Sequence, residues 1–225
     1  MQKLTYEDFY RLAGVSQHKQ FENFLMDIVF QPERREKFYR GLIELGIHSD
    51  EDIFQEYFEL YSAERKSKQQ DFTPSSVTDL LASLIHRMRV KSSGLYTYYD
   101  PTAGSGALLI GVWRKDRDEA SMFQYSPRNY LYRADEVADN AIPYLIHNLT
   151  IKGMNAIVVH GNSLTGTAKQ AYFIQNLKDD FMKFSSINVM PHTTDVMRYL
   201  EITRWEEKEK QYIEDKNVLP FIPAN

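Results

Sequence analysis

The first third of the chain places apolar residues at the spacing of α-helices. Two runs, 21–29 and 38–45, each gather aromatic and aliphatic side chains on one helical face. A third run, 53–61, follows the acidic segment 49–52, which suits the first turn of a helix because its carboxylates complement the helix dipole. These runs predict an N-terminal helical bundle over residues 1–70.

The pattern changes after the polar segment 63–70, where short strand-like runs begin to alternate with helical ones. The predicted order is helix 74–85, strand 96–100, helix 107–113, strand 130–134, helix 137–150 and strand 156–160. Alternating strands and helices favour a parallel sheet wrapped by helices. The sequence therefore predicts an α/β fold, with a Rossmann-like domain over residues 71–225.

The pattern weakens beyond Gly161. Segments 171–174 and 187–190 have the composition of short strands, and 194–215 has the polar and apolar content of a helix. We expect the last residues to be irregular because prolines interrupt them.

The amino-acid composition excludes several classes of protein. With 43% hydrophobic and 13% aromatic residues among 225, the chain can bury enough surface to fold. It contains neither an apolar run of the roughly 18 residues that a membrane helix needs nor a signal peptide, so we expect no membrane association and a cytoplasmic location. The lack of cysteine excludes thiolate metal sites and cysteine nucleophiles. A net charge of −4 argues against a freestanding nucleic-acid binder, so any DNA contact must be local or shared with a partner.

The most informative segment is Asp-Pro-Thr-Ala-Gly-Ser-Gly at 100–106, between a predicted strand and a predicted helix. Its small residues let a ligand approach the backbone, and the N–H groups that open the helix offer hydrogen bonds. The carboxylate of Asp100 favours a ligand with an amine or hydroxyl groups. A third glycine for a dinucleotide and a Gly-Lys-Ser/Thr for a nucleoside triphosphate are both missing. A plain strand-to-helix turn is the alternative interpretation.

Two more polar residues follow the next predicted strands. Glu136 can accept hydrogen bonds from the two hydroxyls of a ribose, as acidic residues do in nucleotide-binding folds, or it can simply start a helix. Asn162, in Gly161-Asn162-Ser163-Leu164, can bond an adenine edge or form a turn.

The ordered set of these motifs, preceded by Phe72-Thr73-Pro74, resembles the S-adenosylmethionine-binding half of adenine-N6 DNA methyltransferases, above all the modification subunits of type I restriction systems. The resemblance covers roughly residues 50 to 165. It implies S-adenosylmethionine as cofactor, DNA as substrate, a separate specificity subunit and thus a possible hetero-oligomer. The cofactor-binding residues that it implies are Phe72, Thr73, Pro74, Asp100, Thr102, Gly104, Ser105, Gly106, Glu136 and Asn162.

Within that resemblance each part has a role. The segment 72–74, Asp100 and the glycines would hold the methionine end, Glu136 the ribose hydroxyls, and Asn162 the adenine amino group. Asn162 stands where the family has an aspartate, and its amide oxygen can still accept that hydrogen bond.

The family's catalytic motif, an Asn or Asp followed by two prolines and an aromatic residue, is not present. Two degenerate stand-ins contain an asparagine, Asn176 after 172–175 and Asn188 within 187–192. Catalytic residues therefore stay unassigned. Three hypotheses remain open: an active adenine-N6 methyltransferase, a non-catalytic S-adenosylmethionine-binding or partner subunit, and a methyltransferase for RNA or a small molecule.

Overall fold

The computed structural model describes residues 5–46, 50–55, 57, 75–92, 94–120 and 124–220. The helices are α1 (Tyr6–Ala13), α2 (His18–Ile28), α3 (Pro32–Glu44), α5 (Ser75–Met88), α6 (Ala107–Ala120), α7 (Ile142–Ile151) and α8 (Thr194–Tyr199), with a 3₁₀ turn at Pro127–Asn129. The strands are β1 (Lys91–Ser92), β2 (Leu95–Asp100), β3 (Tyr130–Glu136), β4 (Ala156–Asn162), β5 (Thr167–Gln175), β6 (Ser186–Val189) and β7 (Arg204–Trp205). The α/β fold class that the sequence indicates is confirmed.

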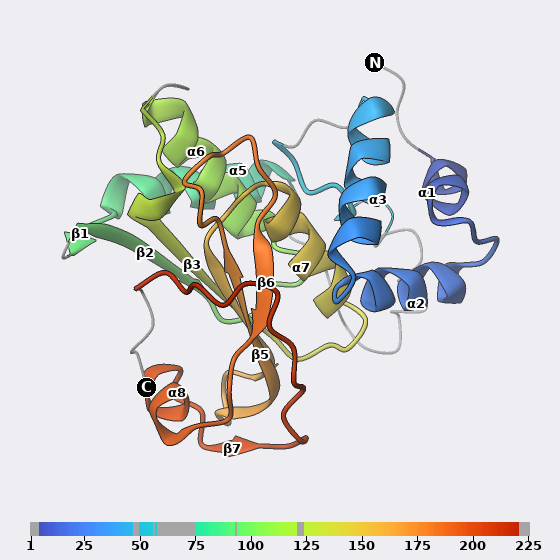
Figure 1. The fold of residues 1–225 in the computed structure, drawn as a ribbon. Helices are drawn as coiled ribbons and strands as arrows, with labels where there is room; N and C mark the ends of the chain where they lie inside the picture. Colours follow the sequence, from blue (N-terminus) through green and yellow to red (C-terminus); the bar gives the residue numbers. More distant parts are fainter. Residues whose placement is uncertain are drawn as a thin grey trace.

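One twisted sheet organises the molecule, in the order β1-β2-β3-β4-β5-β6, with β7 beside β5. Strands β2, β3 and β4 are parallel, as their alternation with helices predicts, while β5 and β6 continue the sheet in antiparallel pairing. Figure 1 shows α6 and α7 on one side of this sheet and α8 at its lower end. The carboxyl ends of the three parallel strands therefore meet at one edge.

Two apolar layers sandwich the sheet. Facing α6 and α7, tyrosines and small aliphatic residues of β2–β5 pack with helix residues such as Leu145 and Leu149. On the other face, residues such as Ile157 and Phe173 pack with Val196 and Leu200 of the α8 segment. Strand β4 is covered on both faces and accordingly begins with a continuous apolar run over residues 156–159.

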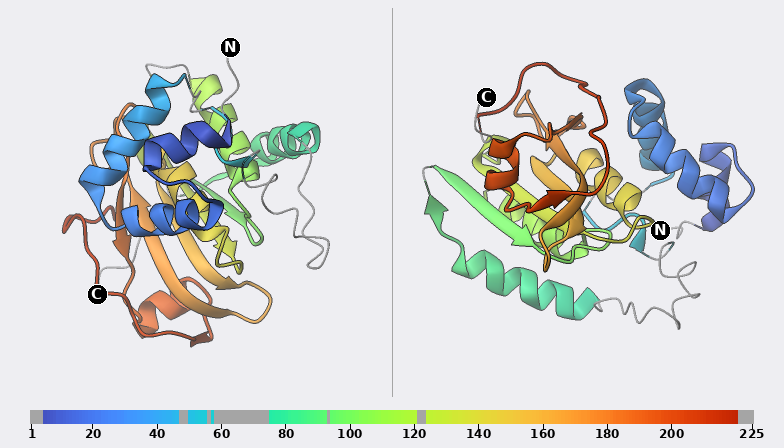
Figure 2. Two further views of the ribbon diagram at one scale, coloured as in Figure 1. Left: turned by 90° about the vertical axis from the view of Figure 1, so that its right-hand side faces the viewer. Right: turned by 90° about the horizontal axis from the view of Figure 1, so that it is seen from below.

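The N-terminal helices α1, α2 and α3 pack around an aromatic cluster that includes Phe9, Phe21 and Phe38. They join the sheet domain through α7, whose buried His147 lies 2.6 Å from the Tyr39 hydroxyl and 2.8 Å from the Leu25 carbonyl oxygen. Figure 2 shows these helices together on one side of the sheet domain. The predicted boundary at residue 70 lies outside the described residues and stays a prediction.

The helix predicted over 194–215 is wrong beyond Tyr199. Glu201 adopts a left-handed φ of 56°, which ends α8, and the chain then turns back to the sheet as β7. The backbone N–H of Glu206 donates to Ala168 O of β5 at 2.7 Å, and the N–H of Val189 in β6 donates to Tyr212 O at 2.9 Å. These long-range bonds outweigh the local helical content of the segment.

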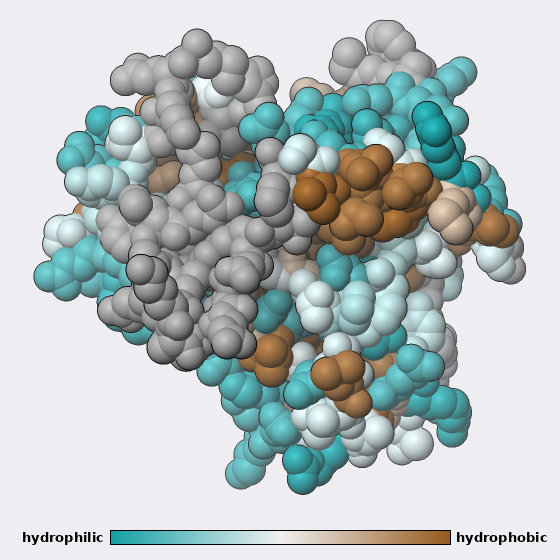
Figure 3. All heavy atoms as spheres, turned by 180° about the vertical axis from the view of Figure 1, so that it is seen from behind, coloured by the Kyte–Doolittle hydropathy of each residue, from teal (hydrophilic) through white to brown (hydrophobic). Residues whose placement is uncertain are grey.

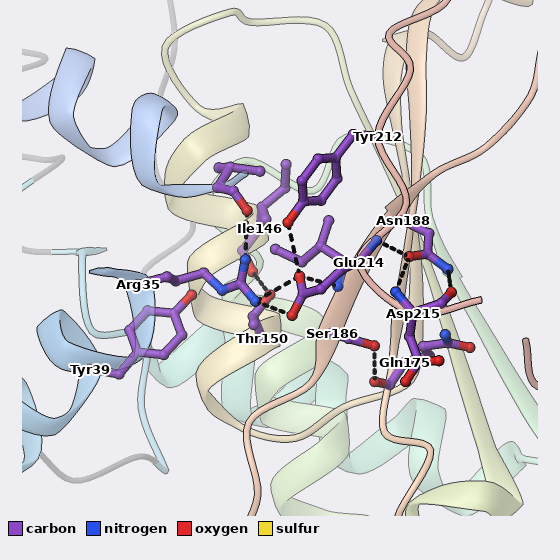
Figure 4. A network of polar contacts seen from close by, with 12 residues as sticks. Arg35, Tyr39, Ile146, Thr150, Gln175, Ser186, Asn188, Tyr212, Glu214 and Asp215 are labelled. Carbon is purple, nitrogen blue, oxygen red and sulfur yellow. Dashed lines mark hydrogen bonds and ion pairs between the residues drawn. The ribbon is translucent and has the colours of Figure 1, made fainter. Parts of the chain in front are cut away.

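A buried ion pair fixes the segment after β7 against the rest of the molecule. Arg35, 1% exposed, binds both carboxylate oxygens of Glu214, at 2.7 and 2.9 Å, and donates to Val29 O at 2.6 Å. Figure 4 shows this contact between the N-terminal helices and residues 212–215, a strap that runs along β6. The strap therefore covers the β6 edge of the sheet.

The predicted helix 137–150 begins later, at Ile142. The preceding residues form a turn because the N–H of Ala138 donates to the Glu136 carboxylate at 2.7 Å, and Pro143 lies in the first turn of α7, where it costs no hydrogen bond. In the described part of the chain, none of the helices is long and apolar enough to span a bilayer.

Candidate functional site

Three polar side chains lie at the carboxyl ends of the parallel strands. Asp100 ends β2, Glu136 ends β3 and Asn162 ends β4. The register pairs Asp100 with Ala134 and Glu136 with His160, so each strand reaches two residues, or about 7 Å, further than the one before it. Open α/β sheets bind ligands at this edge, where the loops that follow the strands meet.

The glycine loop turns sharply between β2 and α6. Gly104 and Gly106 have φ of 56° and 98°, a region that other residues adopt only with strain. A Cβ at Gly106 would lie 2.9 Å from a methyl group of Leu145, so this glycine also lets α6 approach α7. A Cβ at Gly104 would meet nothing within 4 Å, so open space lies beside the loop.

Glu136 binds the glycine loop directly. One carboxylate oxygen accepts the N–H of Gly104 and the other the N–H of Ala138, both at 2.7 Å. The Ala103 N–H also donates to Asp135 O at 3.0 Å, so the end of β3 and the loop form one unit. A carboxylate can accept about four hydrogen bonds, which leaves each oxygen of Glu136 able to accept one more.

Asp100 lies buried on the same face of the sheet as Glu136. Burial raises the pKa of its carboxyl, and the nearby Glu136 and Asp135 carboxylates raise it further, against the lowering effect of the Thr102 N–H, which donates to it at 3.1 Å. No positively charged side chain pairs with Asp100 or Glu136 among the described residues. This edge is therefore acidic and would be stabilised by a cation.

Asn162 uses its side-chain oxygen within its own turn. That oxygen accepts the backbone N–H groups of Leu164 and Thr165 at 3.0 and 3.3 Å. The neighbouring Ser163 hydroxyl donates to Pro101 O at 2.9 Å and so links this turn to the glycine loop. The geometry favours the turn interpretation of Asn162.

Ser105 connects the glycine loop to residues that the sequence reasoning missed. Its hydroxyl donates to the Asp52 carboxylate, and its carbonyl oxygen accepts the Asn148 amide at 2.9 Å. Asn148 also donates to Asp52 at 2.6 Å. Asp52 belongs to the acidic segment interpreted as a helix start, and the local pattern contains no signal that it would meet a loop 53 residues away.

The remaining predicted residues of the methionine end, Phe72, Thr73 and Pro74, lie outside the described residues. Of the predicted cofactor site, the structure therefore brings together Asp100, Thr102, Gly104–Gly106 and Glu136, and it places Asn162 on the adjacent turn.

Neither asparagine proposed as a catalytic stand-in lies at this edge. Asn176 follows β5 at the amino end of β4 and is held by Gly153 O and Asp180 O, at 3.0 and 2.8 Å. Asn188 is level with Ile157 through the pairing of β4, β5 and β6, five residues or about 17 Å from the end of β4. Figure 4 shows that its amide binds the backbone of the strap.

A small pocket lies on the opposite face of the sheet. Tyr99, Arg133 and Asp135 line it because neighbouring residues of a strand point to opposite faces. Arg133 stacks on the Tyr99 ring, 4.5 Å from its centroid, and binds Asp135 at 3.0 Å. Tyr99, Arg133 and Asp135 therefore satisfy one another across this face of the sheet.

The edge fits the cofactor that the sequence resemblance implies. S-adenosylmethionine carries positive charge and ribose hydroxyls, which suit the buried carboxylates of Asp100 and Glu136. It also carries an adenine ring, and two apolar side chains next to the strand ends, Val137 and Leu164, are 58% and 95% exposed. The open space beside Gly104 leaves room for the backbone to be approached.

Comparison with known proteins places these features in a family. The model of the family described as N-6 DNA Methylase matches residues 49–172, more than half of the chain. Among solved structures, a class I S-adenosylmethionine-dependent methyltransferase from Listeria monocytogenes is similar at 10% identity and a TM-score of 0.40, with 70% of this chain and 53% of that chain covered. The present chain thus spans about half of that structure. No curated protein matches. From the family match, the chain belongs to the N-6 DNA methylase family, in which S-adenosylmethionine is the cofactor.

Proposed function

We propose that this chain binds S-adenosylmethionine at the acidic strand edge for adenine-N6 methylation of DNA. The observation that carries the proposal is the pair of buried carboxylates, Asp100 and Glu136, beside the glycine loop. Neither carboxylate has a positively charged side chain as a partner among the described residues. Asp100 and the loop take the charged methionine end, and Glu136 takes the ribose hydroxyls. Phe72–Pro74 complete the methionine end, as the family resemblance implies, whereas Asn162 shapes the adjacent turn.

Methyl transfer to adenine N6 needs side chains in addition to those that bind the cofactor. When bound, S-adenosylmethionine supplies an electrophilic methyl group: the S–CH₃ bond breaks as the N6–C bond forms, the sulfur keeps the electron pair, and the amino group releases a proton. Adenine N6 is a poor nucleophile, so polar oxygens must accept its hydrogens while an aromatic ring stacks on the flipped base. Loss of one preorganised hydrogen bond of this kind costs about a hundred- to thousandfold in rate.

A specific observation favours a cofactor-binding subunit without independent catalysis. The sequence contains no Asn-Pro-Pro-Tyr, and Asn176 and Asn188 use their amides in structural hydrogen bonds far from the edge. We infer that the chain holds the methyl donor and that the acceptor groups come from outside residues 1–225. Such a chain would act in the cytoplasm as a non-catalytic S-adenosylmethionine-binding subunit of a restriction-modification system and reach DNA through a separate specificity subunit.

Isothermal titration with S-adenosylmethionine tests cofactor binding. Loss of a charge-assisted hydrogen bond costs about 1.5–3 kcal/mol, so Asp100→Ala should weaken binding about 10- to 150-fold. Asp195→Ala, which removes an exposed carboxylate on α8, is the matched control and should leave the affinity unchanged. Equal affinity of the Asp100→Ala variant and the wild type would remove Asp100 from the site.

Transfer of a tritiated methyl group to DNA tests the second step. We expect cofactor binding by the chain alone with no transfer above background. Transfer by the purified chain, followed by its loss in Asn176→Ala or Asn188→Ala, would instead show that this chain is a complete methyltransferase.

A further inference from the structure

Lys152 places a positive charge in the interior of the protein. Lysine side chains normally lie at the surface, where water solvates the ammonium group, and Figure 3 shows hydrophilic residues spread over the back face of the molecule. Lys152, directly after α7, is instead 2% exposed, and its Nζ makes no hydrogen bond among the described residues. A buried ammonium group without a partner lowers stability, and such exceptions are expected mainly at functional sites.

The charged groups that act on Lys152 come from two other segments. Burial lowers the pKa of its ammonium group and Arg117 of α6 lowers it too, whereas Asp52 and Asp50 raise it. Arg117 binds both carboxylate oxygens of Asp50, at 2.5 and 2.8 Å, so these two charges pair with each other. Asp52 forms no ion pair with a described side chain. Lys152 and Asp52 are therefore the two charges left over in this group.

Helix α7 brings Lys152 to the side of Asp52. Lys152 caps the helix in a helical conformation one turn after Asn148, and residues four apart lie on the same helical face. The Asn148 amide donates to Asp52 Oδ1 at 2.6 Å. Lys152 therefore lies on the face of α7 that contacts Asp52.

The hydrogen bonds of Asp52 fit an ionised carboxylate. Its Oδ1 accepts the Asn148 amide and the Phe54 backbone N–H, at 2.6 and 3.0 Å, and its Oδ2 accepts the Ser105 hydroxyl. A proton on Oδ2 would reverse the last bond, and the Ser105 hydroxyl proton would then have no acceptor among the described residues. Burial raises the pKa of Asp52, and the positive charge of Lys152 acts against this effect together with the hydrogen bonds.

Ser105 connects Asp52 to the glycine loop. It lies between Gly104 and Gly106, the two residues with positive φ that shape the loop. Its hydroxyl is held by Asp52, and its carbonyl oxygen accepts the Asn148 amide at 2.9 Å. A change in the hydrogen bond from Ser105 to Asp52 would therefore move the backbone that borders the cofactor site.

We propose that Lys152 is a positioning residue for the cofactor site. Its ammonium group keeps Asp52 as the carboxylate that accepts the Ser105 hydroxyl, and this bond fixes the glycine loop in the shape that takes the cofactor. Burial of Lys152 thus lowers stability and raises cofactor affinity. The proposal rests on the proposed function, which assigns the glycine loop to S-adenosylmethionine.

The direction of one affinity change separates this role from a simple charge effect. Lys152→Met removes a positive charge near a site for a cation, so direct repulsion predicts tighter binding of S-adenosylmethionine. The positioning role predicts binding about tenfold weaker, because the charge-assisted bond from Ser105 is lost. Isothermal titration measures the affinities, with the exposed Lys178→Met as control, and urea unfolding checks that the variants fold. Tighter or unchanged binding by Lys152→Met would overturn the proposal.

Asp52→Asn is a second variant with the same expected effect. The new amide oxygen can accept the two bonds made to Oδ1, and the amide nitrogen reverses the bond to Ser105, as a proton on Oδ2 would. Binding should again weaken about tenfold, and the double variant with Lys152→Met should be no weaker than either single variant, because both act on one bond. A further tenfold loss in the double variant would show that Lys152 acts independently of Asp52 and would overturn the proposal.

Carbon-13 NMR of the cofactor-free protein tests the link between Lys152 and Asp52. The Asp52 carboxyl signal, assigned by its loss in Asp52→Asn, should be that of a carboxylate at pH 7. It should move toward that of the protonated acid in Lys152→Met, and the amide signals of Gly104 and Gly106 should shift with it. An unchanged Asp52 signal in a protein that binds the cofactor would sink only the role of Lys152. Absence of S-adenosylmethionine binding by the wild type would sink the proposed function.

Discussion

Replacement of Lys152 by methionine is expected to stabilise the protein and to remove part of its pH dependence. Lys152 follows α7 and is 2% exposed, and its Nζ has no hydrogen-bond partner among the described residues. Burial lowers the pKa of its ammonium group from 10.5 to about 8, although the Asp52 and Asp50 carboxylates act in the opposite direction. Burial of this charge therefore opposes folding.

The magnitude follows from the two pKa values. Each pKa unit corresponds to about 1.4 kcal/mol, so the charged form costs about 3 kcal/mol at pH 7. Because the folded-state pKa is the lower one, the unfolded chain binds more protons between pH 8 and 10.5, and stability rises with pH in that window. Methionine fills a similar volume without a charge.

Urea unfolding of both proteins at several pH values measures the effect. We expect Lys152→Met to be more stable than the wild type by about 3 kcal/mol at pH 7 and by about 1 kcal/mol at pH 10. The exposed Lys178→Met should show no such change. A Lys152→Met protein that is less stable than the wild type at pH 7, or a difference that stays constant up to pH 10, would show that the buried Lys152 charge does not oppose folding.

Three other substitutions test the elements around the site by urea unfolding. Gly106→Ala should lower the free energy of unfolding by about 1–3 kcal/mol, because its φ is 98° and the new methyl group would meet a neighbouring helix. The loss should exceed that of the control Gly14→Ala, whose φ is 68° and whose methyl group would lie in open space; equal losses would contradict this. Arg35→Met should cost about 3–5 kcal/mol because it leaves the Glu214 carboxylate unpaired in the strap, and a loss below 1 kcal/mol would contradict a buried pair. Asp52→Ala should lower the free energy of unfolding by about 1–3 kcal/mol and weaken cofactor binding through the glycine loop. Unchanged cofactor binding would show that Asp52 does not act on the cofactor site.

Much of the site framework follows from local sequence. Strands β2, β3 and β4 and the loop between Asp100 and Gly106 were predictable because apolar runs, a glycine turn and the following helix are encoded within a few residues of one another. The parallel order follows from the alternation of strands and helices. The acidic edge can then be predicted from the rule that the carboxyl ends of parallel strands lie at the same edge of a sheet.

Other features depend on contacts between distant segments. The segment after Tyr199 has the composition of a helix, but its hydrogen bonds go to β5 and β6. Asn188 looked like a catalytic remnant until the antiparallel pairing of β5 and β6 placed it under the strap. Asp52 reaches Ser105 across 53 residues. Nothing in a local pattern encodes these three outcomes.

A crystal structure of the chain with S-adenosylmethionine would show directly whether the cofactor binds at the acidic edge. We expect the ribose hydroxyls against Glu136 and the charged methionine end beside Asp100 and the glycine loop. A cofactor seated on the opposite face, in the pocket of Tyr99 and Arg133, would contradict it, as would an acidic edge left empty at saturating cofactor.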